Sequence, residues 1–406
     1  MIYLFVFIYL LYLSIYYDIL EKKKCKWTHF KIAVSLLILV AGLRWRVGSD
    51  TVLYAQDFIQ CHDLFHLEIA DFESFDKMPF WVILNAVCKT IWNNYLLVQL
   101  VTCTIHISLI GIFIKKVVPS LCFTMLLFYC FFEYTAWNME ASRHSLAVSF
   151  FLTSLLYLND NKIIVFILFV VLSFLSHVFS GVVILTFLIY YTFVRSETIS
   201  YMIILFVVFV VINDINFFSN LLELFFREAY SGAGYKVYNY AVSDNELLGT
   251  KDYNFLFVLK SILFPIFSFF VLKIVSSYYC KLVFLNKKIF DVAIYLFVLF
   301  QICKFSFGMF FRVADYFAII YQILFILFVI YIVQKIVPKQ RVLVYFVLIL
   351  IPLFQAGYRY WGKAPTGVDN FRRYYPYSSI FNRKIDYERE IDHQIRGGGY
   401  SKDNDY

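Results

Sequence analysis

Hydrophobic runs separated by short polar segments make up most of the chain. Runs of about 20 apolar residues are typical of transmembrane helices, because that length crosses the hydrocarbon core of a bilayer. The first run has neither a basic start nor a small-residue cleavage site after it, so we expect a retained helix rather than a signal peptide. The pattern predicts an all-α polytopic membrane protein with about twelve transmembrane helices, at residues 1–20, 30–43, 95–114, 119–134, 145–158, 163–176, 178–194, 199–217, 253–272, 289–308, 316–334 and 342–357.

Residues 79–92 are apolar but short, and they include Asn85 and Lys89. A segment of this length is more typical of a re-entrant or interfacial helix than of a membrane span. If it does cross the membrane, every later loop changes side. The non-crossing interpretation places nearly all loop lysines on one face, in agreement with the positive-inside rule, and we adopt it.

The same rule sets the direction of the chain. The lysine-rich segment 22–31 is predicted to be cytoplasmic, and both ends then lie outside. We expect a membrane domain at 1–357, with external loops at about 47–94 and 218–252, and an external tail at 358–406. The end of the tail lacks apolar side chains to bury, so it is predicted to be disordered.

Composition supports this class and excludes others. Hydrophobic residues make up 62% of the chain, more than a soluble protein can bury. The net charge of +8 is accounted for by the lysines of the cytoplasmic loops, so no nucleic-acid partner is expected. The eight cysteines are scattered, with neither the spacing of a zinc site nor that of a disulfide framework. We predict no metal site and no cofactor.

The first polar cluster closes the second hydrophobic run, in the sequence GLRWRVGSD. It contains Arg44, Arg46 and Asp50, and Tyr54 follows. Two guanidinium groups one residue apart suit an anionic head group such as a diphosphate, which arginine binds through paired hydrogen bonds. The alternative is that both arginines are ordinary anchors at the membrane surface.

Three further clusters are predicted on the same outer face. They hold Asn138, Glu140, Arg143 and His144 in WNMEASRHSLA, His177 in FLSHVFSG, and Arg312, Asp315 and Tyr316 in FGMFFRVADYF. The inner loops contain mostly lysine, whereas the outer clusters contain arginine. Orientation in the membrane depends on both residue types, so this sorting needs another cause. Anion binding on the outer face is the cause that we favour.

A transferase acting on a lipid diphosphate needs fixed positive charge and a base. The diphosphate, and the charge that develops on it as it leaves, would be held by Arg44, Arg46, Arg143 and Arg312. A proton from the attacking hydroxyl would be accepted by His177, Asp50 or Glu140. Further substrate contacts would come from Tyr54, Asn138, His144, Asp315 and Tyr316.

Each cluster also has a simpler interpretation. Arg312 and Asp315 lie three residues apart on a predicted helix and could pair with each other. Glu140 could pair in the same way with Arg143 or His144, and His177 could be a polar contact at a helix end. The shared face of all four clusters is what favours a site.

The four motifs, in this order over roughly residues 1–360, resemble the EpsG family of Wzy-like bacterial polysaccharide polymerases. The resemblance implies a GT-C-like glycosyltransferase of the bacterial inner membrane, with its active site facing the periplasm or exterior. Its substrates would be oligosaccharide repeat units on undecaprenyl diphosphate, and its partners the lipid bilayer and a chain-length regulator. The family's arginine–glutamine pair is replaced here by Arg143–His144. The outer loops carry no DxD motif, which fits a metal-independent reaction.

Two other classes of function remain open at this point. A flippase or transporter of lipid-linked oligosaccharides would line a cavity with arginines, but should show an internal repeat and more charges within the spans. A membrane acyltransferase that decorates polysaccharide would use His177 to activate a hydroxyl. It would also need functional residues on the inner face, where the loops carry little besides lysine.

Overall fold

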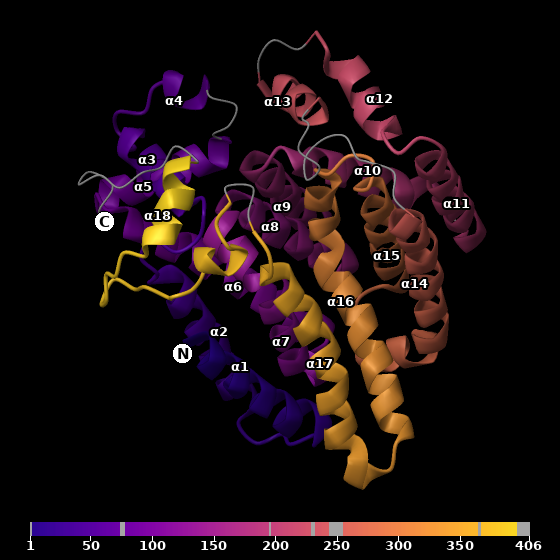
Figure 1. The fold of residues 1–406 in the computed structure, drawn as a ribbon. Helices are drawn as coiled ribbons and strands as arrows, with labels where there is room; N and C mark the ends of the chain where they lie inside the picture. Colours follow the sequence, from indigo (N-terminus) through magenta and orange to yellow (C-terminus); the bar gives the residue numbers. More distant parts are fainter. Residues whose placement is uncertain are drawn as a thin grey trace. The chain divides into compact units, whose positions relative to one another are not determined.

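The computed structural model describes residues 2–73, 78–194, 196–228, 232–242, 255–363 and 367–395. Within these ranges the regular structure is helical, apart from isolated β-bridges, and no strand forms (Figure 1). The all-α class is therefore confirmed. The chain divides into two compact units, of which unit 1 comprises Met1–Glu73, Pro79–Thr153 and Val329–Tyr406, and unit 2 comprises Ser74–Met78 and Ser154–Phe328.

Unit 1 is built from both ends of the chain. Its helices are α1 (Ile2–Leu13), η1 (Ser14–Ile19), α2 (Lys26–Gly42), α3 (Thr51–Gln60), α4 (Ala70–Glu73), α5 (Pro79–Ile91), α6 (Tyr95–Val117), η2 (Pro119–Leu121), α7 (Cys122–Phe132), η3 (Ala136–Glu140), most of α8 (Ser142–Asn159), η4 (Pro338–Gln340), α17 (Arg341–Tyr360), η5 (Asn370–Arg373) and α18 (Tyr387–Ile395). The unit also takes the last residues of α16.

Unit 2 is formed by the central part of the chain. Its helices are the end of α8, then α9 (Ile163–Ser176), α10 (Phe179–Phe193), α11 (Glu197–Asn213), α12 (Phe217–Phe226), α13 (Gly232–Ala241), α14 (Phe255–Leu282), α15 (Lys287–Cys303) and most of α16 (Phe310–Lys335). Within this unit α15 contacts α10, α11 and α14.

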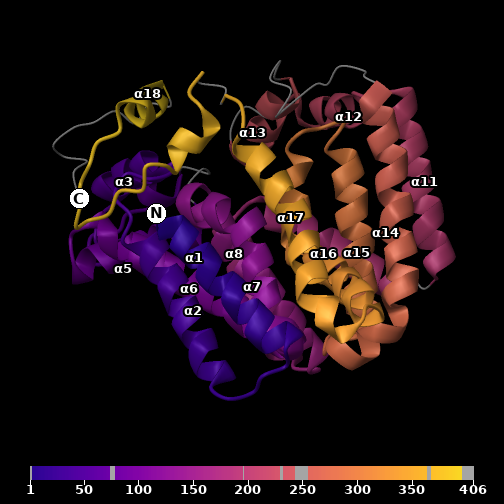
Figure 2. The same cartoon turned by 60° about the horizontal axis from the view of Figure 1, so that its bottom comes forward.

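The core of unit 1 is a layer of long apolar helices. Helix α2 lies along α6, and α1 lies along α7, as Figures 1 and 2 both show. Two glycines permit the close α2–α6 contact. A Cβ atom on Gly42 would lie 2.7 Å from Leu100 Cδ1, and one on Gly111 would lie 3.2 Å from Val34 Cγ2. Close contact between two apolar helices brings many atom pairs to the optimal distance, and their small dispersion energies add up to a large stabilisation.

The expected number of spans is not confirmed. Among the residues that the structure describes, four helices are long and apolar enough to cross a membrane (Ile2–Ile19, Tyr95–Val117, Leu259–Ser276 and Phe310–Lys335), or five if the bent pair α11 and α12 forms one span. Other predicted spans form shorter helices: α9 has 14 residues and α10 has 15. At 1.5 Å per residue these reach only about 22 Å, less than the roughly 30 Å of a hydrocarbon core.

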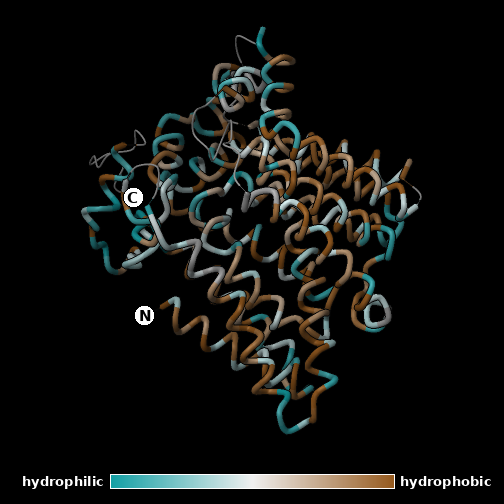
Figure 3. Tube along the Cα trace, turned by 45° about the vertical axis from the view of Figure 1, so that its right-hand side comes forward, coloured by the Kyte–Doolittle hydropathy of each residue, from teal (hydrophilic) through white to brown (hydrophobic). Residues whose placement is uncertain are grey.

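The predicted loops also contain regular structure. The interval 47–94 holds α3, α4 and α5, and α5 is the 13-residue helix at the place where a short helix was predicted. The interval 218–252 holds most of α12 and all of α13. Figure 3 shows hydrophobic residues along most helices and hydrophilic ones at the turns. The end of the tail, 396–406, lies outside the described residues, so its predicted disorder is untested.

Candidate functional site

The turn after α2 is held together by Arg44. Its Nη1 donates to the carbonyl of Ala41 at 2.6 Å, and its Nε donates to the carbonyl of Val47 at 3.1 Å. Nη1 also lies 3.7 Å from Cys103 Sγ on α6. The last carbonyls of a helix have no partner inside the helix, and here a buried guanidinium supplies one. Arg44 thus shapes the segment that carries the other residues of its cluster.

The tail of the chain pairs with this turn along the main chain. Trp45 N donates to Ser378 O at 2.9 Å, Gly48 N donates to Arg373 O at 2.9 Å, and Ile380 N donates to Leu43 O at 3.1 Å. Arg389 adds side-chain hydrogen bonds to the carbonyls of Arg46, Arg372 and Pro376. The segment 373–380 is therefore fixed against residues 43–48.

Arg46 is engaged by a carboxylate from α18. Its Nε and Nη2 donate to the two oxygens of Glu390 at 2.9 and 2.6 Å, the paired geometry that was predicted for a diphosphate. Only 2% of the Arg46 side chain and 10% of the Glu390 side chain are exposed. His393 lies 3.5 Å from the same carboxylate, and its Nε2 lies 3.1 Å from the carbonyl of Gly48.

These contacts set the charge state of Glu390. Burial by itself raises the pKa of a carboxyl group, but hydrogen bonds from His393 and Arg46 outweigh it and lower the pKa of Glu390 to about 2. Glu390 is therefore ionised throughout the physiological range and neutralises Arg46.

The first two predicted clusters meet in unit 1. Ser49 Oγ donates to Glu140 Oε1 at 2.9 Å, and Thr51 Oγ1 donates to Met139 O at 3.2 Å. Gly48 makes this approach possible: its φ is +99°, and a Cβ atom there would lie 1.8 Å from Met139 O. The end of η3 is thus seated directly on the turn that precedes α3.

Arg143 and Tyr54 form the second contact between these clusters. The Arg143 guanidinium lies 5.4 Å from the centre of the Tyr54 ring, and the two side chains share a hydrogen bond. Asp57 and Asp50 interact electrostatically with Arg143. The Tyr54 ring packs in turn on Trp81 of α5, with centroids 5.1 Å apart. Arg143 is only partly buried, unlike Arg44 and Arg46.

Glu140 is partly accessible, with 19% of its side chain exposed. Arg373 Nη1 lies 3.6 Å from it, and Arg373 Nε lies 3.7 Å from Asp392. The simpler interpretation paired Glu140 with Arg143 or His144, but its contacts are with Ser49 and the tail.

Two residues of the second cluster point into the protein core. Asn138 Nδ2 donates to Tyr129 Oη at 2.7 Å and to Tyr134 O at 2.8 Å. His144 is 2% exposed. The Tyr129 hydroxyl also lies 3.0 Å from His106 Nε2, while His106 Nδ1 lies 2.7 Å from the carbonyl of Ser145. This network fixes the break between η3 and α8, on either side of which Glu140 and Arg143 lie.

The remaining predicted residues belong to unit 2. His177 ends α9, and Phe179 N donates to its Nδ1 at 3.4 Å. Arg312 and Asp315 lie 4.0 Å apart, so the simpler pairing interpretation holds for them. Tyr316 is buried and interacts with the Ser180 side chain, which joins the start of α16 to the turn after His177. The third and fourth clusters therefore also meet.

The tail residues were missed from the sequence. Arg373, Glu390, Asp392 and His393 show no apolar periodicity, and their sequence suggested only a polar external segment. The one available signal was the density of charge in YEREIDHQI, because alternating charges on a helix often pair with a second charged surface.

The comparison with protein families gives one match. The model described as "EpsG family" matches residues 27–379. Comparisons with curated proteins and with solved structures give no match. The matched range contains every residue of the four predicted clusters and ends before α18.

Proposed function

The chain belongs to the EpsG family of Wzy-like polysaccharide polymerases, and on that premise we propose the reaction that it catalyses. It transfers a glycan from a lipid diphosphate, undecaprenyl diphosphate, onto a second lipid-linked repeat unit. The reaction takes place on the outer face of the bacterial inner membrane. The glycan would become a capsule, exopolysaccharide or O-antigen chain.

The meeting of the first two clusters is the observation that supports this proposal. Ser49 contacts Glu140, and Tyr54 contacts Arg143. A carboxylate and a guanidinium therefore lie together at the break between η3 and α8. A carboxylate beside a hydroxyl and an arginine beside a tyrosine are suited to accepting a proton and binding an anion, respectively.

The arginines have different roles in this proposal. Arg44 donates to main-chain carbonyls and Arg46 donates to Glu390, so both position the turn, and Arg44 also contributes positive charge. Arg143 is less buried, and we assign direct contact with the diphosphate to it. Preorganised donors aimed at a developing negative charge are usually the largest single contribution to catalysis.

The reaction itself is a displacement at the anomeric carbon. A hydroxyl of the acceptor sugar attacks this carbon, the bond to the diphosphate oxygen breaks, and its electron pair leaves with the diphosphate. The hydroxyl proton passes to a base, for which we favour Glu140 over Asp50 and His177 because it lies at the contact between the first two clusters, beside Ser49 and Arg373. Arginine charge holds the leaving group, so the reaction needs no divalent cation.

A glycan analysis of a deletion strain tests the function. Loss of a polymerase should leave single repeat units on the outward-facing lipid, whereas loss of a flippase should leave them facing the cytoplasm. Complementation with Arg143→Ala should give no long chains, since removal of a transition-state donor costs about 10²- to 10³-fold in rate. Arg143→Lys should be partly active, because it keeps the charge and loses the forked geometry. A normal chain-length ladder from Arg143→Ala at wild-type protein level would refute the assigned role.

A further inference from the structure

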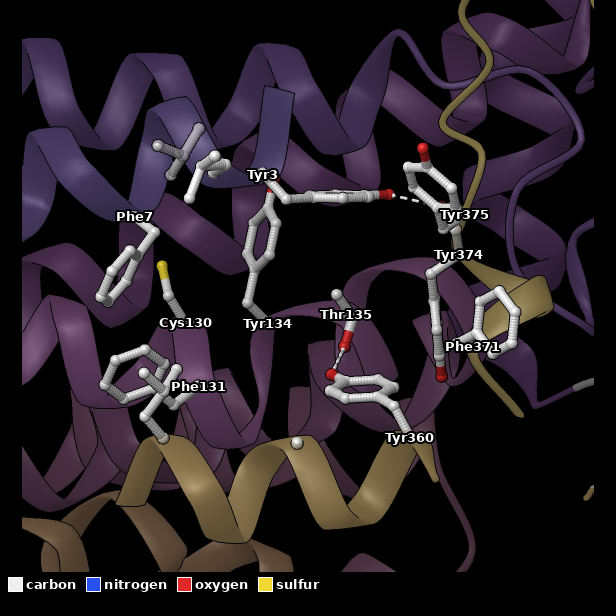
Figure 4. A pocket seen from close by; sticks show the side chains of 14 residues that line it. Tyr3, Phe7, Cys130, Phe131, Tyr134, Thr135, Tyr360, Phe371, Tyr374 and Tyr375 are labelled. Carbon is white, nitrogen blue, oxygen red and sulfur yellow. Dashed lines mark hydrogen bonds between the residues drawn. The ribbon is translucent and has the colours of Figure 1, made fainter. Parts of the chain in front are cut away.

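Unit 1 contains a cavity that none of the predicted clusters lines. Its volume is about 500 Å³, and its walls come from α1, α7, the turn after α7, α17 and the tail around η5. Figure 4 shows Tyr3 and Tyr360 on opposite sides of it. Cavities of about 300–1,000 Å³ are the usual size of ligand sites in proteins.

The walls of the cavity are apolar even though they are rich in tyrosine. The Tyr3 hydroxyl donates to the carbonyl of Tyr374 at 3.2 Å, and the Tyr134 hydroxyl donates to the carbonyl of Leu37 at 2.7 Å. The hydroxyls of Thr135 and Tyr360 bond to each other (Figure 4). These four hydroxyls thus pair within the protein, and the rings and methyl groups beside them remain to contact a ligand. Such a surface favours a hydrocarbon over a sugar or an ion.

The surroundings of the cavity connect lipid with the candidate site. Leu4 lines it on α1, within a candidate membrane span, and is 52% exposed. Phe371 and Tyr374 line it in the tail, and Arg373 lies between them in the sequence and reaches Glu140. A hydrocarbon chain that enters the cavity past Leu4 would therefore end beside η5, whose Arg373 contacts the proposed base Glu140.

We propose that this cavity binds the hydrocarbon chain of the lipid that carries the glycan, close to its phosphate end. This inference rests on the proposed function for the identity of the carrier. The phosphate end lies next to η5, where Arg372 pairs with Asp386 and Glu388, and Arg373 pairs with Glu140 and Asp392. The phosphate replaces part of these carboxylate contacts when the lipid binds.

Gly357 on α17 offers a direct way to fill the cavity. It lines the space, and a Cβ atom placed on it would meet nothing within 4 Å. Gly357→Phe therefore adds a ring at the wall of the cavity, and its Cβ atom collides with no neighbour. Leu343→Phe is the matched control, because Leu343 is an exposed residue of the same helix, outside the cavity.

The experiment uses two photoactivatable lipids on the purified full-length protein: a polyprenyl diphosphate and a phosphatidylglycerol, each with a diazirine in its chain. We expect the polyprenyl probe to label peptides containing residues 130–135 and 353–360. Gly357→Phe should lower this labelling about tenfold, and Leu343→Phe should leave it unchanged. Unlabelled polyprenyl diphosphate in excess should also suppress labelling of the wild type, which tests the site even if Gly357→Phe fails to fold.

Two outcomes would overturn the inference. Equal labelling of the wild type and Gly357→Phe would place the chain elsewhere, and equal labelling by both probes would make the cavity a site for bulk membrane lipid. Neither outcome bears on polymerisation, since the labelling needs no acceptor. Conversely, a deletion strain that makes normal long chains would refute the proposed function without changing the labelling.

Discussion

The contacts of Glu390 with His393 and Arg46 should hold the tail on unit 1, and their combined contribution can be worked out. The pKa of Glu390 lies at about 2, against an ordinary value of 4.5. A tenfold change in proton affinity corresponds to about 1.36 kcal/mol, so ionised Glu390 stabilises the folded state by about 3 kcal/mol at neutral pH. Because its pKa is lowered on folding, this stabilisation is complete above about pH 4.5 and is lost as the pH falls toward 2.

The perturbation is Glu390→Ala, which leaves the Arg46 charge buried without its carboxylate. Breaking a buried pair in this way typically costs about 3–5 kcal/mol, in agreement with the figure from the pKa. The matched control is Glu388→Ala on the same helix. Glu388 pairs with Arg372 at 3.1 Å, but 47% of its side chain is exposed, so its removal should cost no more than about 1 kcal/mol.

The assay measures local opening of the tail through a buried position. Ser378 is 2% exposed, and its carbonyl accepts the hydrogen bond from Trp45. In a Ser378→Cys background, a thiol reagent can reach the new side chain only when the tail opens. A loss of about 3 kcal/mol should speed this labelling about 100-fold in Glu390→Ala.

The result that would refute the reasoning is an equal labelling rate in Glu390→Ala and Glu388→Ala. The buried pair would then contribute no more than an exposed one. Measuring the rate per peptide by mass spectrometry separates the introduced cysteine from the native ones, of which Cys25 is exposed.

Three further predictions concern topology, chemistry and the Gly48 turn. Phe65→Cys should react with an impermeant thiol reagent in intact cells and Lys162→Cys should not; the reverse pattern would invert the topology. Polymerisation by the purified protein should continue in excess EDTA, and a loss that magnesium or manganese restores would contradict the arginine-held leaving group. Gly48→Ala should lower the free energy of unfolding of unit 1, measured with denaturant. The loss should exceed the roughly 1–2 kcal/mol that a non-glycine residue costs in the left-handed conformation, because the new Cβ also collides with Met139 O. Gly362→Ala has a similar positive φ and open space around it, so equal losses in the two variants would show that the collision is unimportant.

The helical class could be predicted from the sequence, but the number of spans could not. Apolar runs show where helices form, because both membranes and protein cores require satisfied main-chain hydrogen bonds. They do not show where a helix ends. The predicted span at 119–134 is divided into η2, α7 and a turn, and the one at 178–194 becomes the 15-residue α10.

The site was predictable only in its local parts. The motifs around Arg46 and Glu140 could be recognised because a charged side chain at the end of an apolar run is energetically costly, so such residues are often functional. Their partners were not visible: Arg46 and Glu390 are 344 positions apart, and no local pattern connects them. The simpler interpretation of Glu140 was a pair with nearby Arg143 or His144, whereas in the structure it contacts Ser49 and Arg373.

The position of α18 also bears on the order of events during synthesis. Unit 1 begins with α1 and is completed by the last described helix, while all of unit 2 is made in between. Arg46 therefore emerges from the ribosome long before Glu390 and must remain without that partner until residue 390 has been synthesised. Domains generally fold as their chains are completed, so the N-terminal half cannot mature early here. A nascent chain stalled before residue 387 lacks α18, so unit 1 stays incomplete although the long apolar helices are already present. Such a chain should accordingly be degraded by the proteases that remove unfolded membrane proteins.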